Sequence, residues 1–224
     1  LEGLWSDARR IPVPAPPKAR TAAGRSRRAA TNRGADAMAA PLKPFTTLVD
    51  FVTGREVPNI GAEENRQAVE RLLVEQKGYD REEIEVEVPI EMAIAGEIYR
   101  SAVDLVVKAA GRRVMACRCA AGSLASCERE ILAAARILGR CQIPLAVVSD
   151  GSSAVVLDTL SGRTIGEGLE AIPAKADLLA RLEQLQFSDL PGERRTREEL
   201  IFRTYDRERV NSALCLGTPS LSAD

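Results

Sequence analysis

The sequence predicts an α/β fold in which a mixed central β-sheet is flanked by helices. Residues 98–107 and 114–119 are rich in β-branched and apolar side chains and enclose an Ala110-Gly111 turn, a pattern typical of a β-hairpin. Residues 62–77 and 126–139 instead place apolar side chains at helical spacing. The expected order is α-β-β-β-α-β-β-α, and its other elements are strands at 84–88, 143–148 and 154–157 and a last helix beginning at Pro173.

The two longer helices have recognisable beginnings and ends. Gly78 follows the first helix and suits the left-handed conformation that often ends a helix. Glu64 lies in the first turn of this helix, where the helix dipole favours an acid, so capping is its default role. Ser126 suits the N-cap of the second helix, and Glu128 and Glu130 lie in its first turn.

Asp104 interrupts the apolar character of its strand. A buried carboxylate is costly unless it is paired or binds a metal, so either this strand has a solvated face or Asp104 belongs to a nuclease-like metal site. Because side chains alternate along a strand, Asp104 and Val106 should share one face, with Val103 and Leu105 on the other. If the three strands pair in order, one surface gathers Glu87, Asp104, Ala116 and Arg118.

The composition divides the chain into three segments. Residues 1–37 are basic and rich in proline, lack apolar periodicity, and are predicted to be disordered. They could be an organelle presequence, a nucleic-acid-binding arm, or translated upstream sequence before a natural start at Met38, which we favour. Residues 38–187 should form the domain, and residues 188–224 a charged helix and tail. The charged helix is expected to dock through one narrow stripe of Leu200, Ile201 and Tyr205.

Several functions are excluded by what the sequence lacks. Histidine is absent, which rules out histidine-dependent catalysis and histidine-ligated metals. No apolar run approaches the roughly 18 residues that would predict a membrane span. There is no Walker motif or other glycine-rich phosphate loop, and hence no ATP-binding motif. Without residues 1–37, which carry a net charge of +5, the chain has a net charge of −6, which argues against a surface that coats DNA broadly.

The five cysteines include no Cys-x-x-Cys pair. Cys117 and Cys119, followed by Cys127 and Cys141, could in principle form a zinc or iron–sulfur site. Their positions on apolar stretches favour buried, reduced core thiols instead. Reduced thiols in turn predict a cytoplasmic protein.

At these positions the sequence resembles the restriction-endonuclease-like (PD-(D/E)XK) nucleases, whose motif is an Asp followed by Glu-x-Lys on the neighbouring strand. Over about residues 45–185 it is most similar to the N-terminal nuclease domain of the R subunit of type I restriction enzymes. The resemblance implies a role in restriction–modification, Mg²⁺-dependent cleavage of DNA, and Asp104 as a catalytic metal ligand. The matching stretches are Glu63-Glu64-Asn65-Arg66-Gln67, Gly78-Tyr79, the strand with Asp104, and residues 143–151.

The sequence departs from the motif where the resemblance places Glu-x-Lys, because Ala116-Cys117-Arg118 stands there. Ala116 cannot bind metal, and Arg118 keeps a positive charge for phosphate without being equivalent to Lys. The acids that could compensate are Glu64, Glu87 and Glu128. The resemblance therefore implies a stand-alone nuclease-like protein with weakened or lost cleavage, using Mg²⁺ only if active. The alternative is a non-catalytic module that binds nucleic acid or protein through the old cleft.

Overall fold

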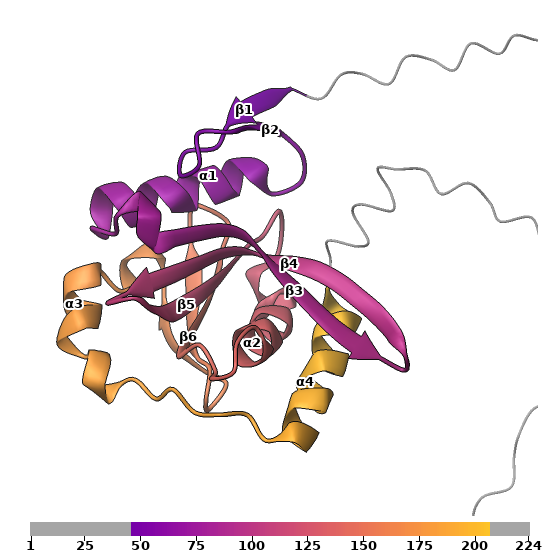
Figure 1. Ribbon diagram of the computed structural model, residues 1–224. Helices are drawn as coiled ribbons and strands as arrows, with labels where there is room; N and C mark the ends of the chain where they lie inside the picture. Colours follow the sequence, from indigo (N-terminus) through magenta and orange to yellow (C-terminus); the bar gives the residue numbers. More distant parts are fainter. Residues whose placement is uncertain (1–45, 207–224) are drawn as a thin grey trace, which may run out of the picture. The chain divides into compact units, whose positions relative to one another are not determined.

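A six-stranded mixed sheet with helices on both faces forms the centre of the computed structural model, which describes residues 46–206 (Figure 1). This architecture confirms the expected α/β class. The elements are β1 (Thr47–Val49), β2 (Glu56–Pro58), α1 (Glu63–Arg71), β3 (Ile84–Ile94), β4 (Glu97–Ala109), β5 (Arg112–Cys119), α2 (Glu128–Ile137), β6 (Leu145–Ser149), β7 (Ala154–Asp158), β8 (Arg163–Glu167), α3 (Lys175–Ala180) and α4 (Gly192–Tyr205).

The structure adds strands to the expected order at two places. Strands β1 and β2 form a small antiparallel sheet of their own, and three-residue strands are too short to show an alternating pattern. The edge strand β8 is largely exposed and contains Gly166, so its sequence has the character of a loop. Helix α4 is the charged helix that the sequence predicts after residue 188. Residues 1–37, Met38 and residues 207–224 lie outside the described range.

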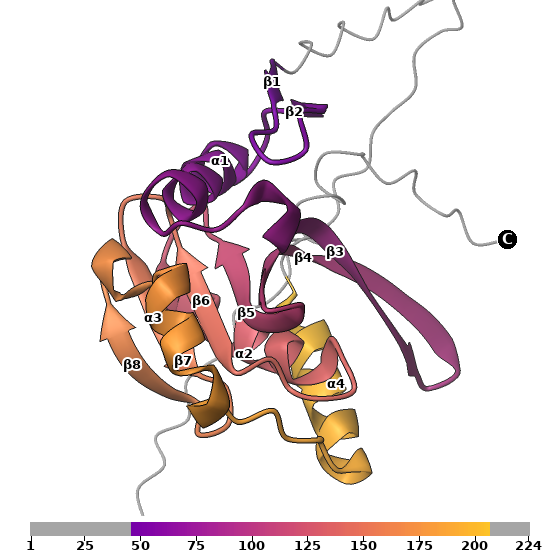
Figure 2. The ribbon, with the colours of Figure 1, turned by 60° about the vertical axis from the view of Figure 1, so that its left-hand side comes forward.

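The strands of the main sheet lie in the order in which they occur in the sequence, from β3 to β8. Strands β5 and β6 pair in parallel, and α2 connects them, while every other neighbouring pair is antiparallel. Gly78 takes the expected left-handed conformation, with φ +76°, where the chain turns from the first helix toward β3. Helices α1 and α3 cover one face of the sheet, and α2 and α4 the other (Figure 2).

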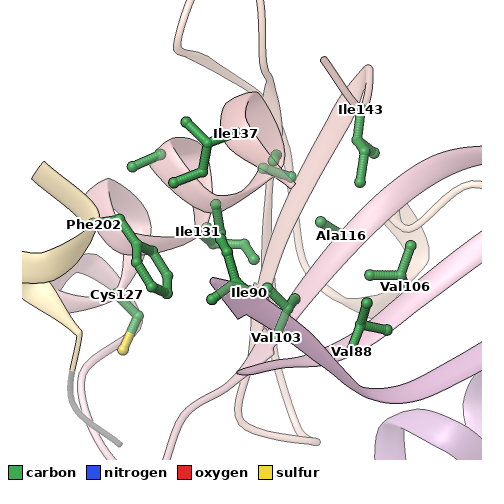
Figure 3. Close-up of a cluster of buried hydrophobic side chains, with 14 of the residues drawn as sticks. Val88, Ile90, Val103, Val106, Ala116, Cys127, Ile131, Ile137, Ile143 and Phe202 are labelled. Atoms are coloured by element: carbon green, nitrogen blue, oxygen red, sulfur yellow. The ribbon is translucent and has the colours of Figure 1, made fainter. Parts of the chain in front are cut away.

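Each face of the sheet therefore has its own apolar cluster. Phe202 of α4 and Ile131 of α2 pack with sheet residues that include Ala116 and Val106 (Figure 3). Cysteine burial is confirmed at three positions, Cys117, Cys119 and Cys127. It is wrong for Cys141, which lies in the connection after α2, is exposed, and donates from its thiol to Asp189.

Along the β3–β4 hairpin, the apolar side chains switch from one cluster to the other at Glu87 and Asp104. Val103 and Val106 both pack on the α2 side, while Leu105 packs on the α1 side, so the strict alternation expected around Asp104 is wrong. The physical cause is a local twist: Glu87, opposite Asp104, has a left-handed φ of +51° inside a strand. The outer half of the hairpin curls away from α1 (Figures 1 and 2). Asp104 consequently lies where the chain passes from one cluster to the other.

Helix α4 docks on α2 by a face that the sequence predicted only in part. Ile201 packs against the α2 cluster as expected, and Tyr205 accepts a hydrogen bond from Arg129 of α2. Leu200, in contrast, is 49% exposed, and the buried residues of α4 are Phe202 and Glu198. Glu198 accepts a hydrogen bond from Arg136 of α2 at 2.9 Å, and Arg195 donates to backbone carbonyls at the end of α2. Glu198 is therefore buried, although the apolar pattern of the helix predicts that this charged residue faces solvent.

Candidate functional site

Asp104 lies on β4 with its side chain 15% exposed, and both of its oxygens are engaged. Oδ1 accepts a hydrogen bond from Arg118 of β5 at 2.8 Å, and Oδ2 accepts one from the backbone N–H of Cys119. Burial raises the pKa of Asp104 above its usual value, and the positive charge of Arg118 and the Cys119 N–H oppose that rise. Hairpin pairing thus brings together two of the predicted site residues, Asp104 and Arg118.

Arg118 continues from Asp104 to a second acid, Glu130. The Arg118 Nε atom lies 3.1 Å from Glu130 Oε1, and both side chains are less than a tenth exposed. Glu130 was expected to lie in the first turn of α2 without a site role. Its burial could have been read from the helix period, because Glu130 lies four residues before the buried Ala134. Asp104, Arg118 and Glu130 form what we call the Arg118 cluster.

Ala116 shares a strand face with Arg118 and is fully buried in the cluster beneath α2 (Figure 3). Its near neighbours in that cluster include Val106, the residue paired with it on β4. The position where the resemblance places the motif Glu is therefore occupied by a methyl group within an apolar layer.

A second group of acids surrounds Arg66 of α1, which is 4% exposed. Arg66 contacts carboxylate oxygens of four residues, and we call these five side chains the Arg66 cluster. The nitrogen–oxygen distances are 2.7 Å to Glu63, 3.0 Å to Asp50, 3.4 Å to Glu70 and 3.7 Å to Glu87. The charge of Arg66 also lowers the pKa of Asp104, so the two clusters interact electrostatically.

The acids of the Arg66 cluster titrate differently. Burial raises the pKa of Glu70 to about 7, and the nearby charge of Asp50 adds to the rise. Burial has the same tendency at Asp50, but hydrogen bonds from Thr53 and Gln67 and the charge of Arg66 leave its pKa below the usual value. The cluster thus holds one acid that is fully ionised and one that is partly protonated at neutral pH.

Two of the three candidate compensating acids contact residues outside the Arg118 cluster. The Glu87 side chain is 66% exposed and approaches Arg66. Glu64 accepts a hydrogen bond from Asn59 Nδ2 at 2.7 Å. Glu128 is half-buried at the beginning of α2 and forms no ion pair with any residue in 46–206.

These donors do not fit a Mg²⁺ site. Magnesium needs several oxygen ligands in near-octahedral geometry, and it usually keeps some of its water molecules. Here a guanidinium group lies between the two acids of the Arg118 cluster, and both oxygens of Asp104 are already bonded. Within the described residues no three acids or cysteines are grouped so that they could hold a metal ion.

A helix with the length and apolar character needed to cross a bilayer does not occur in residues 46–206.

A mixed sheet covered by helices on both faces, with an Asp and an Arg joined across neighbouring strands, defines this protein as an α/β domain with a polar centre. The family model described as type I restriction enzyme R protein N terminus matches residues 61–173, just over half of the chain, so the chain belongs to that family. The match begins at α1 and ends before α3. No curated protein and no solved structure matches the chain.

Proposed function

We propose that this protein is a DNA-binding domain of the PD-(D/E)XK nuclease type that has lost Mg²⁺-dependent cleavage. The observation that carries the proposal is the position of Arg118, whose guanidinium lies between Asp104 and Glu130. In the nuclease motif the Asp and the Glu of Glu-x-Lys hold a metal ion, and the position of that Glu is Ala116 in this chain. Here a side chain supplies the positive charge instead.

The replacement is unfavourable for metal binding in two respects. Mg²⁺ would have to displace a guanidinium that makes charge-assisted hydrogen bonds in a buried setting, where such bonds are strong. It would gain no ligand at Ala116, because that side chain is a methyl group inside the apolar cluster. Arg118 cannot give up its proton and so cannot leave the site by becoming neutral.

DNA is the partner that membership in a restriction-enzyme family supports. The net charge of −6 outside residues 1–37 means that contacts with phosphate must come from local groups of cations. A protein partner for the same surface is the alternative, and a failure to bind duplex DNA would favour it.

The test combines a cleavage assay with a binding assay on the same preparation. We expect no nicking of supercoiled plasmid in Mg²⁺ or Mn²⁺, together with salt-dependent binding of a fluorescein-labelled duplex by anisotropy. Metal-dependent nicking by wild type that Asp104→Asn abolishes would overturn the proposal. Glu130→Gln and Glu128→Gln, two variants in the same turn of α2, would then show which acid supplies the second carboxylate.

Restoring the motif tests the same idea in the other direction. The double variant Ala116→Glu/Arg118→Lys returns a second carboxylate and a Lys to β5, and Mn²⁺ binding by calorimetry should then appear. Because Ala116 is buried, far-UV circular dichroism must first show that the variant folds. A folded double variant that binds no Mn²⁺ would show that these two positions are not what prevents metal binding.

A further inference from the structure

Two arginines share one aromatic ring at the edge of the domain. Phe51, in the turn between β1 and β2, has the guanidinium carbon of Arg71 4.5 Å from its ring centroid and that of Arg81 4.3 Å away. Arg71 is the last residue of α1, and Arg81 begins the short helical turn Arg81–Glu83 that precedes β3. Among residues 46–206, Phe51 is the one ring that two guanidinium groups cover.

Hydrogen bonds to the Arg66 cluster and to Gln67 fix the turn that carries Phe51. The backbone N–H of Phe51 donates to Gln67 Oε1 at 2.6 Å, and the N–H of Val52 donates to Glu70 Oε2 at 3.1 Å. Asp50 is bonded to Thr53 and Arg66. Asp50 and Glu70 are therefore held by Arg66, while Arg71 and Arg81 are exposed.

Contact with the ring leaves N–H edges of both guanidinium groups available. Each edge carries N–H donors in a planar fork that matches the oxygens of a phosphate. Neither fork forms an ion pair or a hydrogen bond with another described residue. That includes the exposed acids near them in sequence, Glu75, Asp80 and Glu82, of which Asp80 pairs with Lys175 instead. Because each guanidinium carbon lies within 4.5 Å of the same ring centroid, the two cations are less than about 9 Å apart and repel each other, and an anion bound by both would offset that repulsion.

We propose that Arg71 and Arg81 on Phe51 form a clamp for a backbone phosphate of duplex DNA. This inference rests on the proposed DNA-binding function and assigns it a contact outside the Arg118 cluster. The contact would position the duplex without reading its sequence, as phosphate contacts do. It also explains how a domain with a net negative charge can hold DNA, since a rigid local pair of cations does not require a basic surface.

The test compares two double variants that lose the same charge. Arg71→Ala/Arg81→Ala should weaken duplex binding about tenfold at roughly 100 mM salt. The negative slope of the logarithm of the binding constant against log salt should become about 0.9 less steep, the value for one lost phosphate contact. Arg163→Ala/Arg181→Ala is the control, because both residues are exposed and form no ion pair within the described range. Its affinity should stay within twofold of wild type.

Arg71→Lys/Arg81→Lys keeps both charges but loses the planar forks, and it should fall between wild type and the Ala double variant. A clamp variant that binds like wild type, or a control that loses as much affinity, would overturn the clamp while leaving the proposed function intact. Plasmid cleavage by wild type would overturn the proposed function and leave the clamp intact. Wild-type protein that binds no duplex would overturn both.

A free phosphate is the other source of the same chemistry. The measurement is NMR of ¹⁵N-labelled protein. Inorganic phosphate should shift the Arg71 and Arg81 Nε–H signals only weakly, and duplex DNA should shift them at far lower concentration. Saturation by phosphate alone, with no added effect of duplex, would assign the pair to a small anion and overturn the proposal for DNA.

Discussion

Two buried arginines, Arg118 and Arg66, each gather carboxylates near the centre of the domain, but they do so in different balance. Arg118 lies between two acids, Asp104 of β4 and Glu130 of α2, the helix that covers one face of the sheet. Arg66 contacts four acids from the β1–β2 turn, its own helix and β3. In the first cluster one guanidinium contacts two carboxylates, and in the second one guanidinium contacts four.

The difference shows that closely spaced acids do not by themselves make a metal site. In the Arg66 cluster the excess negative charge is relieved by a proton, because the pKa of Glu70 rises to about 7. In the Arg118 cluster the guanidinium contacts both carboxylates and offsets part of their negative charge. Both arrangements place a guanidinium among the carboxylates, so a dication would have to compete with that cation.

The largest effect is expected from removing the guanidinium of the Arg118 cluster. Arg118→Met leaves Asp104 and Glu130 without their shared cation, and breaking a buried pair of this kind costs about 4 kcal/mol. Urea unfolding at pH 7 measures the loss. Arg100→Met is the control, because it breaks only the exposed Arg100–Glu91 pair and should change stability little.

Divalent metal sharpens this experiment. If the two acids can reach one cation once Arg118 is gone, Mn²⁺ will raise the unfolding midpoint of Arg118→Met and not that of wild type. A loss of stability below about 1 kcal/mol would contradict the view that the guanidinium holds the cluster together.

The Arg66 cluster predicts a pH dependence of smaller size. Glu70 has a pKa of about 7 in the native protein and 4.5 as its ordinary value in the unfolded chain. As the pH rises, the unfolded chain therefore loses this proton at a lower pH than the native protein does. The contribution of Glu70 to stability therefore falls as the pH rises from about 4.5 to about 7, by roughly 3 kcal/mol. Glu70→Gln removes this titration, so the free energy of unfolding should decline less between pH 5 and pH 7.5 than in wild type.

Urea unfolding at the two pH values measures that difference, and Glu63→Gln is the control. Glu63 contacts the same arginine, but its carboxylate is not fully buried. A wild-type pH profile that Glu70→Gln leaves unchanged would contradict the assignment of the titration to Glu70.

The smallest expected effect concerns Glu87, the exposed member of the Arg66 cluster. Its left-handed φ of +51° is unfavourable for a residue with a Cβ atom, so Glu87→Gly should be about 1 kcal/mol more stable than Glu87→Ala. Comparing these two variants by thermal unfolding cancels the lost charge. Ala93→Gly, at a regular exposed position of β3, should be destabilising instead.

Much of the architecture could be predicted because it is encoded in local patterns. Helix α1 and the β4–β5 hairpin follow from helical spacing and from alternation around a turn at Ala110-Gly111, both of which have left-handed φ values. Pairing in sequence order then brings Asp104 and Arg118 together. The site roles of Asp104, Arg118, Glu64, Glu87 and Glu128 stay predictions.

By itself, the sequence determined the α/β class, the hairpin, the placement of Asp104 on the strand next to Arg118, and the Ala at position 116, because each depends on residues close in the chain or on one register. Only the tertiary structure decided that Glu130 completes the Arg118 cluster, that Arg66 gathers acids from three elements, and that the hairpin changes faces at Glu87. Those outcomes depend on how α1 and α2 pack against the sheet. A charged side chain is buried where packing brings it a partner, and no local pattern specifies that partner.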